Sequence, residues 1–449
     1  VEANDGIINI VMKKQLSDGY NGTLKLSDNQ GYYNNPGAGA NFNFRKNKLA
    51  INTGINAGSF KDQEKYALSN GNDEFRNETF GSSTDPNLNF GVNISADYSL
   101  TKRQSLGMTY NFRFNKSYNS ILEVDNYSSG ILDNRTTNKE NALTRNHSAN
   151  LNYEIKTDSL GSKLSANISF LKYERKMNST NESAPAGGGI PSIFHQSVPQ
   201  YIDNVGALLD YVHKTKGKTT WMFGGSYNNT KTDNDTNQDM ISENGYVNNE
   251  ARSNHFVYEE NIIGLYATLE LTMNEKFSTK VGTRFENTNS EGRVLDKAIG
   301  FKRNYNNILP YLNVNYSINE DNSLTYSFSS RVRRPTFWEL NPIRRYFTPN
   351  NYLQNNPFVL ASKNYNQELN YMFKNAYYAI VQYQIVKDAS GQIPMQGIQI
   401  NNATMEETRF LRYIRTNYGN KEELSLSLGM NKSWFDGIWS ANYMAALEY

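Results

Sequence analysis

The chain contains no cysteine among its 449 residues and carries a net charge of only +2. The absence of cysteine excludes a disulfide framework and any thiolate metal site. The nearly balanced charge gives no strong field for nucleic acid, so no nucleic-acid partner is expected. No stretch approaches the roughly 18 consecutive apolar residues of a membrane-spanning helix. Strands are not excluded as membrane spans, because every second residue of a barrel strand faces a wet lumen.

Patterns typical of catalysis or metal binding are also scarce. Asp233, Asp235 and Asn237 have the spacing of a calcium loop, but Gln238 stands where that loop needs Gly and Asn244 where it needs Glu. This favours a solvated surface loop over a bound cation. No histidine is spaced to pair with another; the four are His147, His195, His213 and His255. We therefore expect no enzyme, no catalytic or metal residues and no cofactor.

The residues that are present alternate between apolar and polar with a period of two. In 88–100 the apolar positions are Leu88, Phe90, Val92, Ile94, Ala96, Tyr98 and Leu100, and in 106–114 they are Leu106, Met108, Tyr110, Phe112 and Phe114. The polar turn 101–104 separates the two runs, so the segment predicts a hairpin of long strands. Such strands suit a transmembrane barrel with lipid outside and water inside, or a large soluble sheet packed on a second layer.

Connections of two lengths alternate along the chain. The long ones are 29–37, 59–87, 115–144, 174–200, 230–254, 287–303 and 330–364, and the short ones lie at 46–47, 101–104, 158–161, 214–218, 274–276, 319–322 and near Asn375. A membrane barrel has short periplasmic turns and long extracellular loops, whereas a soluble sandwich has no reason for this alternation. We therefore predict an all-β, antiparallel, up-and-down transmembrane barrel, with about 18 strands visible.

The polar rows of the predicted strands indicate which residues line the lumen. Charged side chains are unfavourable against lipid but are readily accommodated in a wet lumen. The 31 Tyr, 22 Phe and 4 Trp suit aromatic girdles at the two membrane surfaces. The expected lumen-facing residues are Asn93, Asp97, Asn111, Arg113, Lys280 and Arg284.

The segment 330–360 differs from the rest, because prolines interrupt strand pairing and arginine and aromatic residues gather there. It is interpreted either as a structured loop folded on its own aromatic residues or as a loop that enters or caps the lumen and contacts a ligand or partner. The candidate residues are Arg333, Arg334, Pro335, Trp338, Leu340, Asn341, Pro342, Arg344, Arg345, Tyr346, Asn356 and Pro357.

Two motifs resemble those of TonB-dependent outer-membrane receptors, most closely the outer-membrane β-barrel family of Bacteroidota. One is the Ser-Arg-x-x-Arg-Pro…Leu-Asn-Pro…Asn-Pro succession that starts at Ser330. The other is the opening segment 2–14, which resembles the last strand of the family's plug domain. The residues that carry the second motif are Gly6, Ile7, Ile8, Asn9, Lys13 and Lys14.

The resemblance implies the C-terminal end of a plug domain at residues 1–14 and a barrel at 15–449, incomplete at its C-terminus against the family's 22 strands. It implies a porin-like barrel in the outer membrane of a Gram-negative bacterium that imports a siderophore, glycan or peptide. The implied partners are outer-membrane lipids, a surface lipoprotein lid or other outer-membrane subunits, and TonB if a preceding segment carries the TonB box. The alternative is a barrel subunit of an outer-membrane assembly that imports nothing, suggested by the short N-terminal segment and by Asn355–Ser362, where the family usually has Gly-Asn-Pro and Leu-x-Pro-Glu.

Overall fold

The computed structural model describes residues 18–71, 76–242, 245–250, 252–295, 297, 299–342, 344–348, 351–400 and 407–449. The predicted plug-end motif lies outside these residues. Among the described residues, no helix has the length and apolar character needed to cross a membrane.

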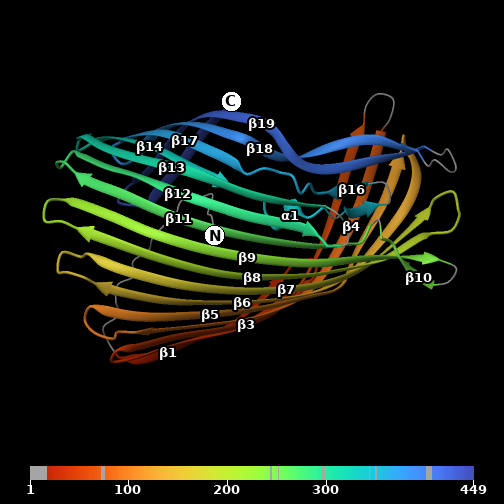
Figure 1. The fold of residues 1–449 in the computed structure, drawn as a ribbon, viewed down its shortest axis with the longest axis horizontal. Helices are drawn as coiled ribbons and strands as arrows, with labels where there is room; N and C mark the ends of the chain where they lie inside the picture. Colours follow the sequence, from red (N-terminus) through yellow and green to blue (C-terminus); the bar gives the residue numbers. More distant parts are fainter. Residues whose placement is uncertain are drawn as a thin grey trace.

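One 20-stranded sheet contains every described strand (Figure 1). Its first half comprises β1 (Gly19–Gln30), β2 (Asn34–Lys46), β3 (Leu49–Gly71), β4 (Arg76–Tyr98), β5 (Gln104–Ser128), β6 (Ile131–Lys156), β7 (Lys163–Pro185), β8 (Ser192–Lys214), β9 (Thr219–Ser242) and β10 (Gly245–Asn248). Its second half comprises β11 (Asn254–Thr272), β12 (Phe277–Val294), β13 (Ile299–Asn319), β14 (Asn322–Arg333), β15 (Arg344–Thr348), β16 (Asn351–Gln354), β17 (Ser362–Phe373), β18 (Tyr377–Ile400), β19 (Glu407–Trp434) and β20 (Trp439–Glu448), with one short helix, α1 (Phe337–Leu340).

The predicted fold class is confirmed, since successive long strands pair antiparallel as in an up-and-down barrel. The predicted long connections nevertheless consist largely of strand. Residues 59–71 and 76–87, for example, are the paired outer halves of β3 and β4. In these halves both faces of the sheet contact water, so apolar and polar residues do not alternate. Their sequence therefore resembles that of a loop, although their backbones still pair. The sheet therefore extends well past the apolar rows at the end where the long connections are predicted. We call this end of the sheet the outer end.

The apolar rows are exposed on the outer face of the sheet. Ile94 and Met108, which belong to the predicted apolar rows, are 42% and 54% exposed. Ile94 lies on β4 and Met108 on β5. The neighbouring strands β3 and β6 carry outward-facing apolar rows in register with them. A soluble protein does not expose apolar area on this scale, because contiguous patches above a few hundred Å² are rare on monomers. The alternative of a soluble sheet packed on a second layer is therefore wrong, and the exposed rows face lipid.

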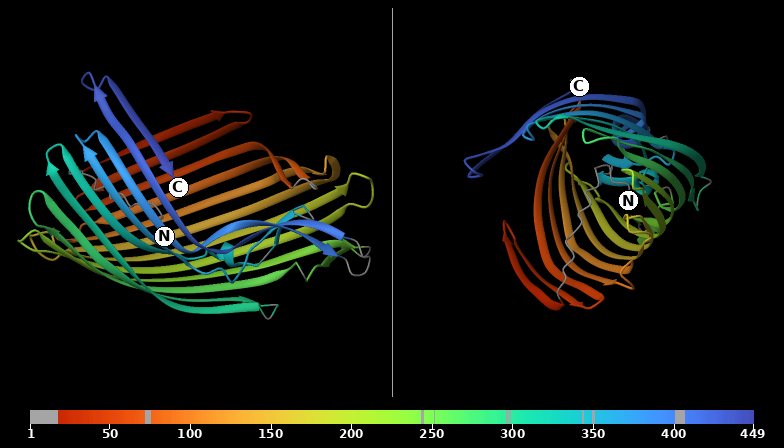
Figure 2. Two further views of the ribbon diagram at one scale, coloured as in Figure 1. Left: turned by 90° about the horizontal axis from the view of Figure 1, so that it is seen from above. Right: turned by 90° about the vertical axis from the view of Figure 1, so that its left-hand side faces the viewer.

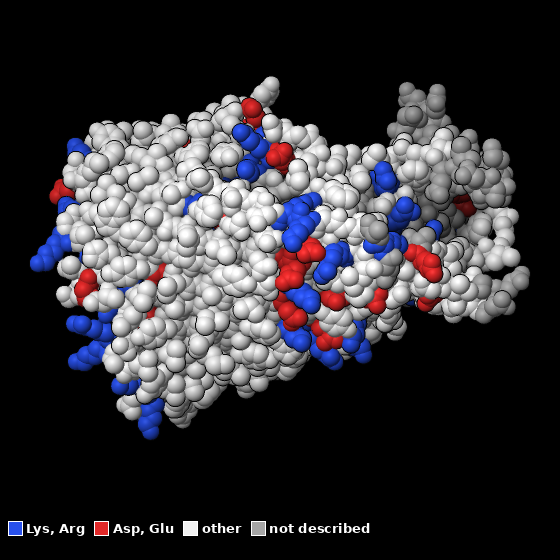
Figure 3. Space-filling model, viewed as in Figure 1, with Lys and Arg blue, Asp and Glu red and all other residues white. Residues whose placement is uncertain are grey.

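Charges mark the limits of the lipid-facing zone. Figure 3 shows charged residues, mostly Lys and Arg, at the left edge, where the short turns lie, and a band of both charge signs across the middle, with a zone of few charges between them. On β11 the outward apolar row spans residues 263–271, and Glu259 lies just beyond it, opposite Lys231 of β9. A membrane strand needs roughly 9–11 residues. Because β11 has 19, about half of it projects beyond the membrane.

The sheet is curved but open in the described residues. β1 pairs with β2 and β20 pairs with β19, and no described ladder joins β1 to β20. Figure 2 shows the two edges on the same side of the curved wall, well separated. Both edges carry exposed apolar side chains, including Leu24 and Leu26 on β1 and Leu447 on β20.

Because neighbouring residues of β11 face lipid and lumen in turn, the same substitution should destabilise the protein to very different extents at two adjacent positions. Ala267→Arg places a charge at the middle of the lipid-facing row and should lower the free energy of unfolding by about 2–4 kcal/mol. Thr268→Arg, one residue on, points into the wet lumen and should lower it by less than about 1 kcal/mol. Denaturant unfolding in lipid vesicles measures both values. Equal destabilisation by the two variants would contradict the assigned faces.

Candidate functional site

The proline-rich segment folds back inside the sheet at its outer end (Figures 1 and 2). Helix α1 begins after Pro335 because Thr336 caps it. The Thr336 hydroxyl accepts from the Glu339 amide at 3.4 Å, and the Glu339 carboxylate accepts from the Thr336 amide at 2.8 Å. This reciprocal capping box satisfies two amides that a helix start leaves free. It also fixes the Glu339 side chain in place.

Glu339 is the electrostatic centre of this loop. Its Oε1 accepts from Arg333 Nη2 at 2.7 Å and from Arg415 Nη1, on β19, at 2.6 Å. Burial by itself would raise the pKa of the Glu339 carboxyl. The Thr336 amide and the two guanidinium groups outweigh burial and hold that pKa below its ordinary value. Glu339 therefore ties three separate segments together as a carboxylate.

A second arginine fastens the loop to the wall. Arg334 Nη2 donates to Glu286 Oε2 at 2.5 Å and to Thr288 Oγ1 at 2.9 Å, both on β12. Arg284 donates to the other oxygen of Glu286 at 2.5 Å and to Ser226 Oγ at 2.9 Å. Both carboxylate oxygens of Glu286 are thus engaged, and the network runs from the loop across β12 to β9.

A carboxyl group whose pKa is raised, and not lowered like that of Glu339, lies close to this network. Glu260 on β11 accepts from the Tyr258 hydroxyl at 2.8 Å. Burial raises the pKa of Glu260, and the Tyr258 hydrogen bond and the Arg334 charge oppose that shift only in part. The wall under the loop thus carries one carboxyl that burial makes easier to protonate.

Apolar contacts anchor the loop at two places on the wall. Leu340 packs in a buried cluster with Phe256, Tyr258 and Val294 of β11 and β12. The Asn341 side chain, next in sequence, donates to Asn234 Oδ1 on β9 at 2.8 Å. These contacts place α1 on the inner face of the wall.

The second anchor lies further along the wall. Tyr352 of β16 is buried with Phe194 of β8 and packs beside Met240 and Phe410. β16 pairs in parallel with residues 411–414 of β19, the one parallel ladder of the described sheet. The loop and the outer part of β19 therefore reach strands on another part of the wall. We call residues 333–342, 344–348 and 351–359 together with 410–417 the inner cap.

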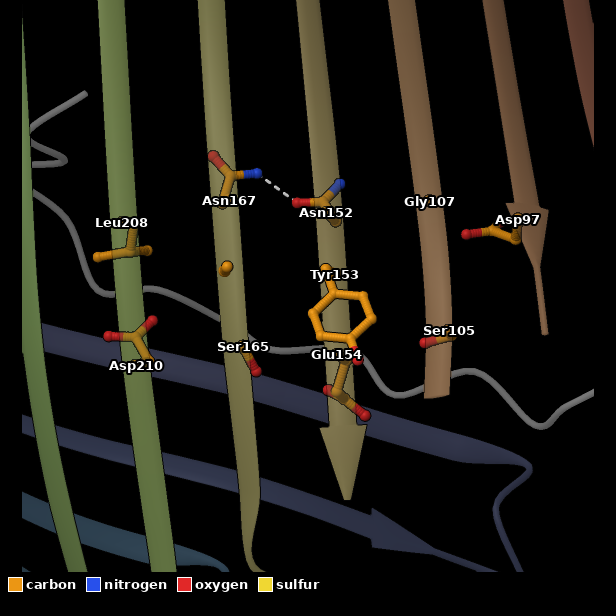
Figure 4. A pocket seen from close by; sticks show the side chains of 11 residues that line it. Asp97, Ser105, Gly107, Asn152, Tyr153, Glu154, Ser165, Asn167, Leu208 and Asp210 are labelled. Atoms are coloured by element: carbon orange, nitrogen blue, oxygen red, sulfur yellow. Dashed lines mark hydrogen bonds between the residues drawn. The ribbon is translucent and has the colours of Figure 1, made fainter. Parts of the chain in front are cut away.

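A second polar region lines the lumen nearer the short turns. It is a hollow of about 440 Å³ whose lining includes Asp97, Asn152, Asn167 and Asp210 (Figure 4). Asn167 donates to Asn152, and Asp210 accepts from Tyr266 Oη at 2.5 Å. The hollow is lined mostly by polar side chains, and these bring no nucleophile and base together. Its groups therefore suit non-covalent contacts with a ligand.

The predicted lumen residues have the following neighbours in the structure. Asp97 lines the hollow, Asn93 is in register with Gly54 and Asn111, and Arg113 opposes Gly91. Lys280 lies opposite Glu270 and forms a long ion pair of 4.0 Å with it, and Arg284 bonds Glu286. Asp233, Asp235 and Asn237 belong to β9 and not to a loop. They face outward, and Asp233 pairs with His255 at 2.9 Å. Among the described residues, no group of three or more potential ligands could hold a metal ion.

The predicted loop residues have separate positions within or beside the inner cap. Trp338 is exposed, although its backbone oxygen accepts from Asn355. Arg344 lies over the Tyr352 ring at 5.0 Å. Pro335 and Pro357 are buried, and Asn356 caps the turn at Phe358. Pro342 is half-buried beside Asn341. Arg345 and Tyr346 belong to β15, and their side chains lie outside the described part of the structure.

Sequence reasoning missed the partners that hold this loop. Glu339 had a local signal, because Thr336-x-x-Glu339 is a capping-box pattern. Glu286, Asn234 and Arg415 had none, since they lie 48, 107 and 76 residues from their partners.

Comparisons with known proteins agree with this architecture. The sequence profile described as "Outer membrane protein beta-barrel family" matches residues 155–449. No curated protein matches the chain. The siderophore receptor PiuA from Acinetobacter baumannii is similar in structure, with a TM-score of 0.62 and 13% identity over 97% of this chain and 64% of that one. A mutant of the ferric enterobactin receptor PfeA from Pseudomonas aeruginosa has a TM-score of 0.58 and 14% identity over 97% of this chain and 62% of that one. The chain thus spans less than two thirds of the length of these receptors, and at such identities the likeness concerns the fold.

Glu339→Gln should loosen the inner cap, because the neutral amide leaves the Arg333 and Arg415 charges without their shared counter-charge. We expect the free energy of local opening to fall by about 3 kcal/mol. Hydrogen exchange of peptides from 333–342 measures it. Glu291→Gln removes an exposed pair with Arg293 and should change the same peptides by less than about 1 kcal/mol. Unchanged exchange in the Glu339 variant would show that the apolar anchors alone hold the cap.

The lowered pKa of Glu339 also predicts a dependence on pH. The carboxylate contributes its full stabilisation above its unfolded-state pKa of about 4.3, and the contribution is lost as pH falls through the lower folded-state pKa. Trp338 fluorescence, in a variant whose other three tryptophans are replaced by Phe, should therefore change in acid below about pH 4. Adding Glu339→Gln should abolish this acid transition. A transition of the same size in both proteins would assign it to another group.

Proposed function

Because the chain belongs to the Outer membrane protein beta-barrel family and is an outer-membrane protein of a Gram-negative bacterium, we propose that it is the barrel of a receptor that imports a bulky nutrient. In this proposal TonB supplies the energy from the inner membrane, and the barrel performs no enzymatic reaction. The nutrient classes are those of the sequence resemblance: a siderophore, a glycan or a peptide. The fold shared with siderophore receptors supports the proposal without fixing the substrate.

The observation that carries this proposal is the inner cap over a polar lumen. A passive pore needs no structured element across its entrance. Here Leu340 and Tyr352 anchor such an element to strands of the wall, and Glu339 and Arg334 fasten it by charge. The hollow near Asp97 shows that the lumen below is polar. A capped polar lumen suits selective uptake, in which a ligand meets fixed groups before it passes the barrel.

Further parts of the proposal concern what surrounds the described residues. We propose that residues 1–14 are the end of a plug domain, that 15–449 are part of a larger barrel, and that the family relationship is to Bacteroidota. In lipid every backbone group must be paired, so the free edges of β1 and β20 need further strands beside them. A surface lipoprotein lid over the outer end is a proposed partner, together with the outer-membrane lipids that contact the apolar rows.

The second candidate is a barrel subunit of an outer-membrane assembly that imports nothing. The network around Glu339 and Glu286 favours it, since a cap held by three arginine–carboxylate contacts is firmly closed. Purification in mild detergent separates the two candidates. A stable complex with several subunits supports the second, whereas a complex with a lipoprotein lid alone supports the receptor.

The receptor proposal predicts energy-dependent uptake. Cells that express the full-length gene should accumulate one member of a panel of radiolabelled ferric siderophores, oligosaccharides and peptides. Accumulation should fall more than about tenfold when TonB is deleted or the proton gradient is collapsed, because the barrel alone supplies no free energy. Deletion of the plug from the same gene is the control, since it should allow leakage that needs no energy. Selective uptake by the intact protein that persists without TonB would contradict the proposal.

A further inference from the structure

The inner wall beneath the second anchor of the cap is lined by uncharged side chains. Register brings Asn181 of β7 opposite Phe194 of β8, and Phe194 opposite Met240 of β9. Gln196 and Gln238 form the next pair along β8 and β9. We call these five residues the amide patch. It combines three side-chain amides with one aromatic and one thioether side chain, and none of the five carries a charge.

The amide patch holds hydrogen-bonding groups that the described protein does not satisfy. Gln238 is 0% exposed, yet neither its Oε1 nor its Nε2 has a hydrogen-bond partner among the described residues. The Oδ1 atom of Asn181, a residue 2% exposed, is likewise without a described partner. Burial of an amide without hydrogen bonds is unfavourable, and most buried polar groups in proteins are paired. Two such groups, on β7 and β9 with β8 between them, therefore point to a ligand that supplies the missing bonds.

Flat rings of the inner cap cover the apolar part of this patch. Tyr352 and Phe410 stack with centroids 6.1 Å apart and planes 26° apart, and both pack in the cluster with Phe194 and Met240. The cap thus places a flat, apolar surface on Phe194 while it leaves the amide of Gln238 unpaired. A better occupant would combine a flat apolar face with hydroxyl or amide groups at its edge.

One of the two covering residues, Phe410, lies on a strand whose ladder is irregular. The β18–β19 ladder is irregular between Val386 and Ser390, where Asp388 has a φ of +54°. Opposite Ala389 lies Gly419, with a φ of +114° that residues other than glycine rarely adopt. Beyond this irregularity the strands carry Phe410 toward the wall. A change of backbone angle here would lift Phe410 from the patch without breaking the membrane-spanning ladder.

We propose that the amide patch is a binding subsite for an uncharged, hydroxyl-rich ligand, a sugar chain, and that Tyr352 and Phe410 occupy it while the cap is closed. Sugar rings offer a flat apolar face for Phe194 and hydroxyl groups that both donate to and accept from Gln238. The subsite deepens the proposed receptor function by naming the substrate class, and it rests on that function. The five residues of the patch offer no cation for an anionic ferric complex.

Three arginines of the cap are held by carboxylates, whereas Arg344 lies over the Tyr352 ring at 5.0 Å and Arg412 contacts Met395 Sδ. Arg333 and Arg415 share Glu339, and Arg334 is bound to Glu286. Arg303 donates to the backbone oxygens of Val359 and Pro357 at 2.7 and 2.8 Å. An anion at any of these four arginines would have to displace their partners, whereas a sugar can bind the unpaired amides directly.

Gln238→Leu tests the subsite in the full-length protein purified in detergent. The leucine keeps the volume of glutamine and removes its buried unpaired atoms, so the thermal midpoint should rise by about 1–3 °C. Binding of a mixed pool of neutral oligosaccharides, followed by calorimetry, should weaken at least about tenfold, because the ligand loses its hydrogen bonds. Asn237→Leu is the matched control, since Asn237 is the next residue on β9 and faces outward. It should change neither quantity.

Three results would overturn the subsite. The first is that the wild-type protein does not bind the oligosaccharide pool or binds an anionic ferric catecholate instead. The second is that Gln238→Leu binds the pool as the wild type does. The third is a lowered thermal midpoint in Gln238→Leu, which would show that Gln238 stabilises the closed protein. Energy-dependent uptake is measured separately in cells. If uptake needs no energy but the purified protein binds the oligosaccharides, the receptor proposal fails and the subsite stands.

Discussion

Lipid cannot form hydrogen bonds, and this constraint determines most of the structure. Every backbone N–H and C=O in the hydrocarbon must find a partner within the protein, so the chain crosses as paired strands. Pairing fixes alternate residues on opposite faces, which places apolar rows such as that of β11 against lipid and polar rows in the lumen. A wide sheet with a polar inner face then has room for a segment that folds inside it. The inner cap is therefore a consequence of the barrel, and its charged residues lie where lipid does not reach them.

The same constraint explains which features the sequence predicts. The period-two rows follow from lipid on one face, so the strand at 88–98 and its partner at 106–114 are visible without any structure. Beyond the membrane both faces are wet and the pattern disappears, although the backbone of β3 and β4 continues to pair up to Gly71 and Arg76. Local chemistry also remains readable, as in the Thr336–Glu339 capping box. Partners such as Glu286 for Arg334 arise only when distant strands are brought together, and no short motif encodes them.

The residues 233–238 illustrate how one segment serves two environments. Their acidic pattern suggests a cation loop on sequence alone, but on β9 the two aspartates face outward, where Asp233 meets His255. Gln238, the residue that spoils the calcium pattern, faces inward. Strand geometry thus separates side chains that are neighbours in sequence, and a pattern that assumes a loop groups residues that never share a face.

The inner cap combines two kinds of contact with opposite consequences. At Glu339 and Glu286 the buried charges are paired, and the removal of either partner would leave an unpaired charge in a poorly solvated place. At Gln238 the closed cap leaves buried polar atoms unpaired, which favours opening. A ligand shifts the equilibrium between a closed and an open cap only by binding one state better, and the proposed subsite gives it groups to bind when Tyr352 and Phe410 have left.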